Sequence, residues 1–233
     1  MLATSAESRE VMVAFPATVF IVDDDADVRR LLSLLVRSVG LLEDCYASAQ
    51  DFLNRFDPQK PGCLLLDIRM PGMSGMELQR ELSSAAPLPP IIFITAHGEI
   101  PLATQAIRAG AFDFIQKPFS PHALLERIRE AIELDRERRC KHAVSVEVQE
   151  RVRHLTDRER EIMHFLALGE STKQIAQRLS ISSKTVDNHR ASILEKMHVD
   201  NPTQLAHLVS PLDKGLGIPG RITSKYGKRG SRS

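Results

Sequence analysis

The sequence predicts an α/β domain built on a doubly wound, five-stranded parallel sheet, followed by a small all-α domain. In the first half of the chain, short apolar runs alternate with segments whose apolar residues recur at helical spacing, which is typical of strands joined by crossover helices. In the second half only the helical spacing recurs. The chain has 233 residues, enough for two ordinary domains, and its 42% hydrophobic content allows each to bury a core.

The central strand of the predicted sheet is residues 62–67. Its wholly apolar run is typical of a strand buried on both faces. Pro71 and Gly72 then turn the chain toward a helical pattern at 76–82, so that Asp67 lies at the carboxyl end of the strand. Open α/β sheets bind ligands at that edge. The ordinary alternative is that Asp67 only begins the turn.

The first strand, residues 19–22, also ends in acids, and a helical pattern from Val28 to Val36 follows it. An acid at a helix start caps the helix, which is a sufficient explanation for Asp25. Asp23 and Asp24 lie at the strand end itself. Two adjacent carboxylates repel each other unless a cation lies between them.

Three further pairs of segments complete the alternation. The expected elements are a peripheral strand at 41–46, a helix at 49–56, a strand at 91–94, a helix at 102–109, a strand at 112–115 and a long helix from Pro121. The carboxyl ends of parallel strands meet at one edge, so this topology gathers polar residues from distant positions.

That edge is expected to carry Asp23, Asp24, Asp67, Thr95 and Lys117, without a glycine-rich phosphate loop. Carboxylate oxygens suit Mg²⁺, which takes one or two protein carboxylates and keeps room for water and phosphate oxygens. An aspartate is a competent nucleophile toward phosphorus once a metal neutralises the incoming group. The threonine could donate a hydrogen bond to one phosphoryl oxygen, and the lysine could pair with another.

Four motifs in this half resemble the signature of a two-component response-regulator receiver domain. They are Val-Asp-Asp at 22–24, Asp-Ile-Arg-Met-Pro-Gly-Met-Ser-Gly at 67–75, Thr-Ala at 95–96 and Lys-Pro-Phe at 117–119. The resemblance extends from about residue 18 to residue 132. It implies a flavodoxin-like strand order 2-1-3-4-5 and a cis peptide bond before Pro118.

The resemblance also implies a role for each residue at the sheet edge. Asp67 is the expected phosphoacceptor. Mg²⁺ (or Mn²⁺) is expected on Asp24, Asp67 and the backbone carbonyl of Arg69, with Asp23 acting partly through water. The remaining expected residues contact the phosphoryl group or respond to it: Thr95, Ala96, Phe114 and Lys117. Position 114 is phenylalanine, where many relatives have tyrosine.

The segment between the two halves changes character at residue 135. The mixed charges at 135–139 are typical of a solvated helix face. Apolar residues at Val144, Val148 and Val152 then indicate a second helix or a linker helix. The expected organisation is a disordered extension at 1–16, a receiver domain at 17–134, a linker at 135–153, a helix-turn-helix domain at 154–210 and a disordered basic tail at 211–233.

Three helices are expected in the second half. Thr156 and Glu159 form a capping box at the start of the first helix, which Gly169 ends. The second helix spans 172–179 and the third 183–197, the plan of a helix-turn-helix. Polar side chains that could reach DNA are expected on the third helix at Lys184, Thr185, Asn188, His189, Arg190 and Ser192.

Three further motifs resemble the LuxR-type output domain over about residues 155–209: Thr-Asp-Arg-Glu-Arg-Glu, Lys-Gln-Ile-Ala and Thr-Val-Asp-Asn-His-Arg. With the receiver in front, the whole chain resembles the NarL/FixJ class, and FixJ-like regulators in particular. By that match Asp187, Asn188 and Ala191 face the major groove. The expected contacts with the DNA backbone come from Lys184, Thr185, His189 and Arg190.

Asp187 departs from relatives that have lysine there. An acid cannot bind phosphate, so two roles stay open: accepting a hydrogen bond from cytosine, or orienting Arg190.

The sequence therefore predicts a DNA-binding response regulator, not an enzyme beyond slow intrinsic self-phosphorylation and dephosphorylation. The expected partners are a sensor histidine kinase, double-stranded DNA, a second copy of the chain on phosphorylation, and RNA polymerase. Because the net charge is only +1, DNA contact requires a local basic patch. No apolar run reaches membrane-spanning length, so no membrane contact and a bacterial cytoplasmic location are expected.

Two other functions remain as alternatives. A regulator could act through protein contact instead of DNA. A magnesium phosphohydrolase could pass through an aspartyl phosphate, but it needs a second acid or a water-positioning group beside Asp67, and the residue two positions on is Arg69.

Overall fold

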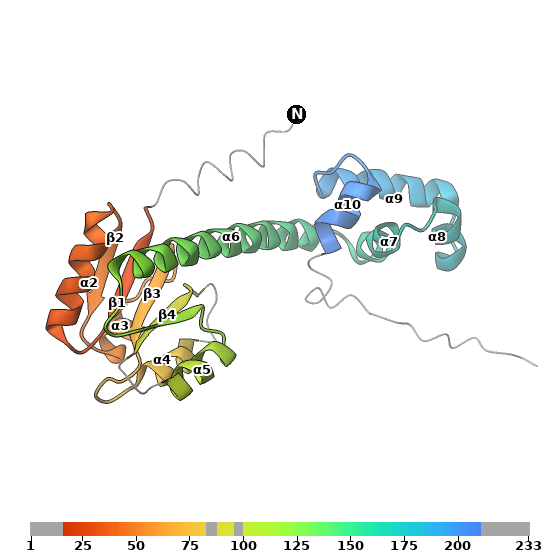
Figure 1. Ribbon diagram of the computed structural model, residues 1–233. Helices are drawn as coiled ribbons and strands as arrows, with labels where there is room; N and C mark the ends of the chain where they lie inside the picture. The colour runs from red at the N-terminus through yellow and green to blue at the C-terminus, as the bar shows by residue number, and fades with distance from the viewer. Residues whose placement is uncertain (1–15, 83–87, 96–99, 211–233) are drawn as a thin grey trace, which may run out of the picture. The chain divides into compact units, whose positions relative to one another are not determined.

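The structure is a computed structural model that describes residues 16–82, 88–95 and 100–210 (Figure 1). The tail at 211–233 and nearly all of the extension at 1–16 lie outside these residues. The chain divides into two compact units, up to His142 and from Ala143 onward. In the described residues, no helix combines the length and the apolar character needed to cross a membrane.

The first unit is built on five parallel strands in the order β2-β1-β3-β4-β5, which confirms the predicted sheet. The strands are β1 (Thr18–Val22), β2 (Leu42–Tyr46), β3 (Gly62–Asp67), β4 (Ile91–Thr95) and β5 (Asp113–Gln116). Val22 pairs with Leu66, and Asp67 pairs with Ile94. The carboxyl ends of β1, β3 and β4 therefore lie side by side, which brings the polar residues that follow these strands to one edge of the sheet.

Helices cover both faces of this sheet. They are α2 (Ala26–Ser38), α3 (Ala49–Arg55), α4 (Gly75–Leu82), α5 (Ile100–Arg108) and α6 (Pro121–Arg153). On one face Phe20, Leu64 and Leu66 pack with buried residues of α3, α4 and α5. On the other, the alternate residues Ile21 and Leu65 pack with α2 and α6. Residues on both faces of the sheet are therefore buried. The helices on both sides of the sheet in Figure 1 give the doubly wound arrangement.

Helix α6 is continuous through the segment where a second helix or a linker helix was expected. The prediction that residues 135–139 are simply solvated is wrong for Asp135, which is 1% exposed. Asp135 Oδ2 accepts hydrogen bonds from the N–H of Gly62 (2.9 Å) and from Arg139 Nε (2.7 Å). Arg139 also donates to the carbonyls of Pro58, Gln59 and Lys60. This ion pair thus satisfies three carbonyls of the loop before β3 and the first N–H of that strand.

The second unit contains α7 (Asp157–Ala167), α8 (Thr172–Leu179), α9 (Ser183–Lys196) and α10 (Pro202–Val209). Its core includes Ile162, Met163, Leu166, Ile175, Val186, Ile193, Met197 and Leu205. The capping box of Thr156 and Glu159 is confirmed, and Ser171 with Gln174 forms a second one at α8. Helix α10 was not predicted, although its start has the cap Asn201 followed by proline at the first helical turn.

Candidate functional site

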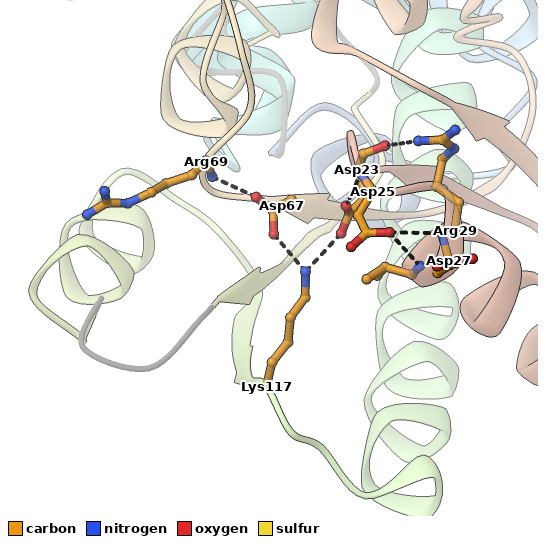
Figure 2. Close-up of polar contacts among 8 residues, drawn as sticks. Asp23, Asp25, Asp27, Arg29, Asp67, Arg69 and Lys117 are labelled. Atoms are coloured by element: carbon orange, nitrogen blue, oxygen red, sulfur yellow. Dashed lines mark hydrogen bonds and ion pairs between the residues drawn. The ribbon is translucent and has the colours of Figure 1, made fainter.

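The strand ends bring two carboxylates and one ammonium group together. Lys117 follows β5, and its N–H donates to the carbonyl of Thr95 at the end of β4 (2.7 Å). Its Nζ lies 3.0 Å from Asp23 Oδ2 and 2.9 Å from Asp67 Oδ1. Figure 2 shows this lysine between the two acids, which come from the ends of β1 and β3. The peptide bond from Lys117 to Pro118 is cis, as expected.

The backbone fixes the carboxylate of Asp67 from the opposite side. Asp67 Oδ2 accepts a hydrogen bond from the N–H of Arg69 (2.8 Å). Helix α4 begins against the same strand end, where a Cβ on Gly75 would lie 2.2 Å from the carbonyl oxygen of Asp67. Only glycine fits such a close approach, so the glycine that ends the 67–75 motif keeps the helix next to the acid.

The three acids that follow β1 have different surroundings. Asp23 is 2% exposed, and its Oδ1 accepts from the N–H of Asp25 (2.9 Å). Asp25 accepts from the N–H groups of Asp27 and Val28 and is the N-cap of α2, so the ordinary explanation for it is confirmed. Asp24 lies between them in sequence and is exposed. Arg29 donates to the carbonyl of Asp23 (2.7 Å) and closes the turn.

The site contains more negative than positive charge. Burial raises the pKa of Asp67 and the charge of Asp23 adds to this, while hydrogen bonding and charge from Lys117 oppose it. The pKa of Lys117 is also raised, because its bonds to the two carboxylates outweigh the cost of burial. One ammonium group thus serves two carboxylates, and Asp24 adds a third acid nearby in sequence.

This donor set fits a divalent cation. In the described ranges, no three His, Cys, Asp or Glu side chains are grouped so that they could hold a metal by themselves. Mg²⁺ does not require such a group, because it binds through one or two carboxylates and completes its shell with water and substrate oxygens. The exposed Asp24, the buried Asp67 and a nearby backbone carbonyl are ligands of the right chemistry.

The other expected switch residues lie on β4 and β5. Thr95 is the last residue of β4 and is 1% exposed, and it pairs in register with Gln116. Phe114 is half-buried on β5 and packs against the core on the α3, α4 and α5 face. Ala96 lies outside the described residues.

Most lysine and arginine side chains described in the second unit are ion-paired. Those that α9 is predicted to present to DNA are not. The pairs are Arg151 with Glu147, Arg153 with Glu150, Arg158 with Glu161, Arg160 with Asp157, Arg178 with Glu170 and Lys196 with Glu159. Within the described part of the chain, the side chains of Lys184, Asn188, His189 and Arg190 have no hydrogen-bond or ion-pair partner. Thr185 shares a hydrogen bond with the N-cap Ser182, and Ala191 is exposed.

Lys173, the second residue of α8, was not among the residues predicted from the sequence to contact DNA. It too is exposed and unpaired within the described residues. Its motif, Lys-Gln-Ile-Ala, contributed to the resemblance to the LuxR-type domain. Only the fold shows that the start of α8 lies beside α9. There Thr172 Oγ1 lies 3.1 Å from Asp187 Oδ1.

Ser192 was expected among the polar groups that face DNA, and this is wrong. Its hydroxyl donates to Glu159 Oε1 (2.7 Å) inside the domain. Glu159 is 4% exposed and also accepts from Lys196 Nζ (2.8 Å) and from the N–H of Thr156 (2.8 Å). Burial raises the pKa of this carboxyl, but Lys196, Thr156 and Ser192 together lower it to about 2. Ser192 faces inward because a buried carboxylate needs every donor within reach.

Comparisons with known proteins cover both units. Residues 19–129 match the family described as response regulator receiver domain, and residues 153–209 match the bacterial regulatory proteins of the luxR family. The response regulator protein TodT of Pseudomonas putida is 42% identical over 200 residues, which are 86% of this chain and 88% of TodT. The transcriptional regulatory protein FixJ of Bradyrhizobium diazoefficiens is 35% identical over 190 residues, 82% of this chain and 93% of FixJ.

A solved structure of the response regulator StyR has a TM-score of 0.73 and 42% sequence identity to this chain, and the match covers 84% of this chain and 99% of StyR. Receiver domains generally bind Mg²⁺ for phosphorylation. The chain therefore belongs to the transcriptional response regulators of two-component systems, with a receiver domain followed by a LuxR-type DNA-binding domain.

Proposed function

We propose that Asp67 accepts the phosphoryl group from a sensor histidine kinase. The observation that supports this most is the position of its carboxylate, which lies at the end of the central strand with Lys117 on one oxygen and the Arg69 N–H on the other. A carboxylate oxygen attacks the phosphorus of the kinase's phosphohistidine. The P–N bond breaks, and its electron pair stays on the imidazole, which takes up a proton. The same site allows slow self-phosphorylation and dephosphorylation.

Mg²⁺ (or Mn²⁺) would bind to Asp24, Asp67 and the backbone carbonyl of Arg69, with Asp23 reaching it through water. When bound, the ion neutralises the charge of the phosphoryl oxygens. The excess of acid over base at this edge supports the assignment, and the exposure of Asp24 leaves that carboxylate accessible.

Phosphorylation changes the partners of Lys117 and Thr95. The ammonium group of Lys117, already 2.9 Å from the carboxylate of Asp67, pairs with a phosphoryl oxygen. The Thr95 hydroxyl donates to another, the small Ala96 leaves access to the group, and Phe114 follows the movement of Thr95. The adjacent ends of β3 and β4 support this sequence of events, because Asp67 pairs in register with the residue before Thr95.

The phosphorylated chain dimerises and binds two DNA half-sites. The surface of α5 and the edge strand β5 is the proposed dimer interface, and Ile107 on α5 is exposed there. Two linked output domains bind DNA far more tightly than one, because the second contact is made at high effective concentration. RNA polymerase is a further proposed partner of the assembled dimer.

Each output domain would hold DNA with α9. Lys184, Thr185, His189 and Arg190 contact the phosphate backbone, and Asp187, Asn188 and Ala191 face the bases. Among the described residues the side chains of Lys184, Asn188, His189 and Arg190 have no partner, whereas most cations elsewhere in the unit are ion-paired, and this supports the assignment.

Sequencing of genomic fragments retained by the purified chain, with and without acetyl phosphate and Mg²⁺, tests this function. We expect enrichment of a two-fold symmetric site that depends on phosphorylation and is absent for Asp67→Asn. Equal enrichment in both samples would contradict the switch and keep the DNA-binding role. No enrichment by protein shown to be phosphorylated would favour a regulator that acts through protein contact.

A further inference from the structure

One acid lies among the polar residues that α9 presents for DNA. Asp187 is exposed and is the fifth residue of the helix, within the amino-terminal part that reads bases in helix-turn-helix proteins. A carboxylate next to DNA phosphates is unfavourable unless a hydrogen-bond donor compensates it. The carboxylate has two oxygens, and the protein or the DNA must supply a donor for each.

The protein does not supply it as an ion pair. Lys184 and Arg190 lie three residues before and after Asp187, a spacing at which helical ion pairs form. This chain makes such pairs elsewhere, for example between Arg158 and Glu161. Yet among the described residues neither cation pairs with Asp187. This arrangement argues against a role for Asp187 in orienting Arg190.

Thr172 holds the carboxylate instead. Its Oγ1 donates to Asp187 Oδ1 across the gap between α8 and α9 (3.1 Å). The bond restricts the rotation of an exposed side chain and uses only one of the two carboxylate oxygens. Oδ2 has no partner in the described part of the chain, and it remains able to accept a hydrogen bond from DNA.

We propose that Asp187 reads a cytosine in each DNA half-site, with Thr172 as the residue that positions it. In the major groove a carboxylate needs a base that presents a donor, and the N4 amino group of cytosine is such a donor. Adenine also presents an amino group, but the N7 acceptor beside it repels a carboxylate, and guanine presents only acceptors there. The inference rests on the proposed DNA contacts of α9 and adds the base that one of them selects.

In vitro selection from a randomised duplex library tests this with the full-length chain, phosphorylated with acetyl phosphate and Mg²⁺. The wild type is compared with Asp187→Ala, Asp187→Asn and Thr172→Val. Glu195→Gln is the matched control, because it removes one exposed acid from the far end of the same helix.

We expect the wild type to prefer cytosine at one position of each half-site by about tenfold, the usual scale for one specific base contact. Asp187→Ala should abolish the preference at that position alone. Asp187→Asn should move it toward adenine, which presents a matching donor and acceptor to an amide. Thr172→Val should keep cytosine but weaken the preference, and Glu195→Gln should change nothing.

A cytosine preference that survives in both Asp187 variants would overturn the proposal, as would a wild-type site in which no position depends on Asp187. Tighter binding by Asp187→Ala with an unchanged site would show that the acid only repels phosphate, and would overturn it too. No enriched site for the wild type would instead contradict the proposed DNA contacts as a whole, which distinguishes the failure of that function from the failure of this inference.

Discussion

Each unit of the chain buries a carboxylate against a lysine, and the two carboxylates respond in opposite ways. In the receiver, Asp67 shares Lys117 with Asp23, and its pKa is raised by burial and by that second acid. In the output domain, Glu159 has Lys196 together with donors from Ser192 and Thr156, and these lower its pKa to about 2. The number of donors for each acid accounts for the difference.

By the proposed function, Asp67 is a reactive carboxylate, and Glu159 is a structural one. Asp67 is held by fewer donors and shares one of them with Asp23, so less energy is needed to release its oxygens for attack on phosphorus. Glu159 is held by several donors on both oxygens, so it contributes to stability by joining α7, which carries it, to α9, which supplies Ser192 and Lys196. The receiver therefore keeps an electrostatically costly site, as functional sites often do.

Replacement of Lys117 should have the largest effect, because it removes the cation that Asp23 and Asp67 share. We expect Lys117→Ala to accept a phosphoryl group more slowly and to lose the whole phosphorylation-dependent gain in DNA affinity. DNA binding of the chain, measured with and without acetyl phosphate, checks this. Lys60→Ala, which removes an exposed lysine paired with Asp44, is the control. A normal gain in Lys117→Ala would contradict the proposed switch.

Replacement of Lys196 applies the same change to the structural site. Lys196→Met should destabilise the output domain by about 2–3 kcal/mol, because Glu159 then remains buried with fewer donors. Hydrogen exchange of peptides from α7 and α9 in the full-length chain measures the loss. Lys173→Met, at a lysine that has no partner among the described residues, should leave the exchange unchanged. Equal protection in both variants would show that the pair does not stabilise the fold.

The pH dependence of Glu159 follows from its lowered pKa. Its ionised form stabilises the fold fully above the ordinary value of 4.5, and this stabilisation is lost as the pH falls toward about 2. Glu159→Gln should cost about 1–2 kcal/mol at neutral pH, and the difference from wild type should shrink below pH 4.5. Chemical unfolding over a pH series measures this. A difference that does not depend on pH would mean that charge is not responsible. Glu161→Gln, at an exposed ion pair, should change stability by roughly 0.5 kcal/mol or less.

Replacement of Asp67 should change stability by less than replacement of Lys196 or Glu159, and in the opposite direction. Because its pKa is raised from the ordinary 3.8, ionisation costs more in the folded chain than in the unfolded one, so stability falls as the pH rises above that value. Asp67→Asn should therefore stabilise the receiver at neutral pH, by roughly 0.5–1 kcal/mol. Hydrogen exchange of β3 peptides measures it. A loss of stability would mean that the ion pair with Lys117 outweighs burial.

The sequence predicted the sheet and its reactive edge because both follow from local patterns. The apolar run of β3 and the acid that ends it are adjacent in the chain, and parallel topology then brings Asp23, Asp67 and Lys117 together. Interactions between distant residues were missed. Asp135 was expected to be solvated and Ser192 to reach DNA, since nothing nearby in sequence shows that the N–H of Gly62 or the carboxylate of Glu159 needs them. The role of Thr172 likewise depends on how α8 packs beside α9.

The position of the phosphoryl group tests the central claim most directly. The full-length chain is incubated with acetyl phosphate and Mg²⁺ and then reduced with borohydride, which converts an aspartyl phosphate into homoserine. Peptide mass spectrometry then locates the product, with Asp57→Asn, at an exposed acid in the loop before β3, as a control that should still react. We predict homoserine at position 67 in the wild type and in the control, and none in Asp67→Asn. Homoserine at another acid, or undiminished labelling of Asp67→Asn, would contradict the assignment of the phosphoacceptor.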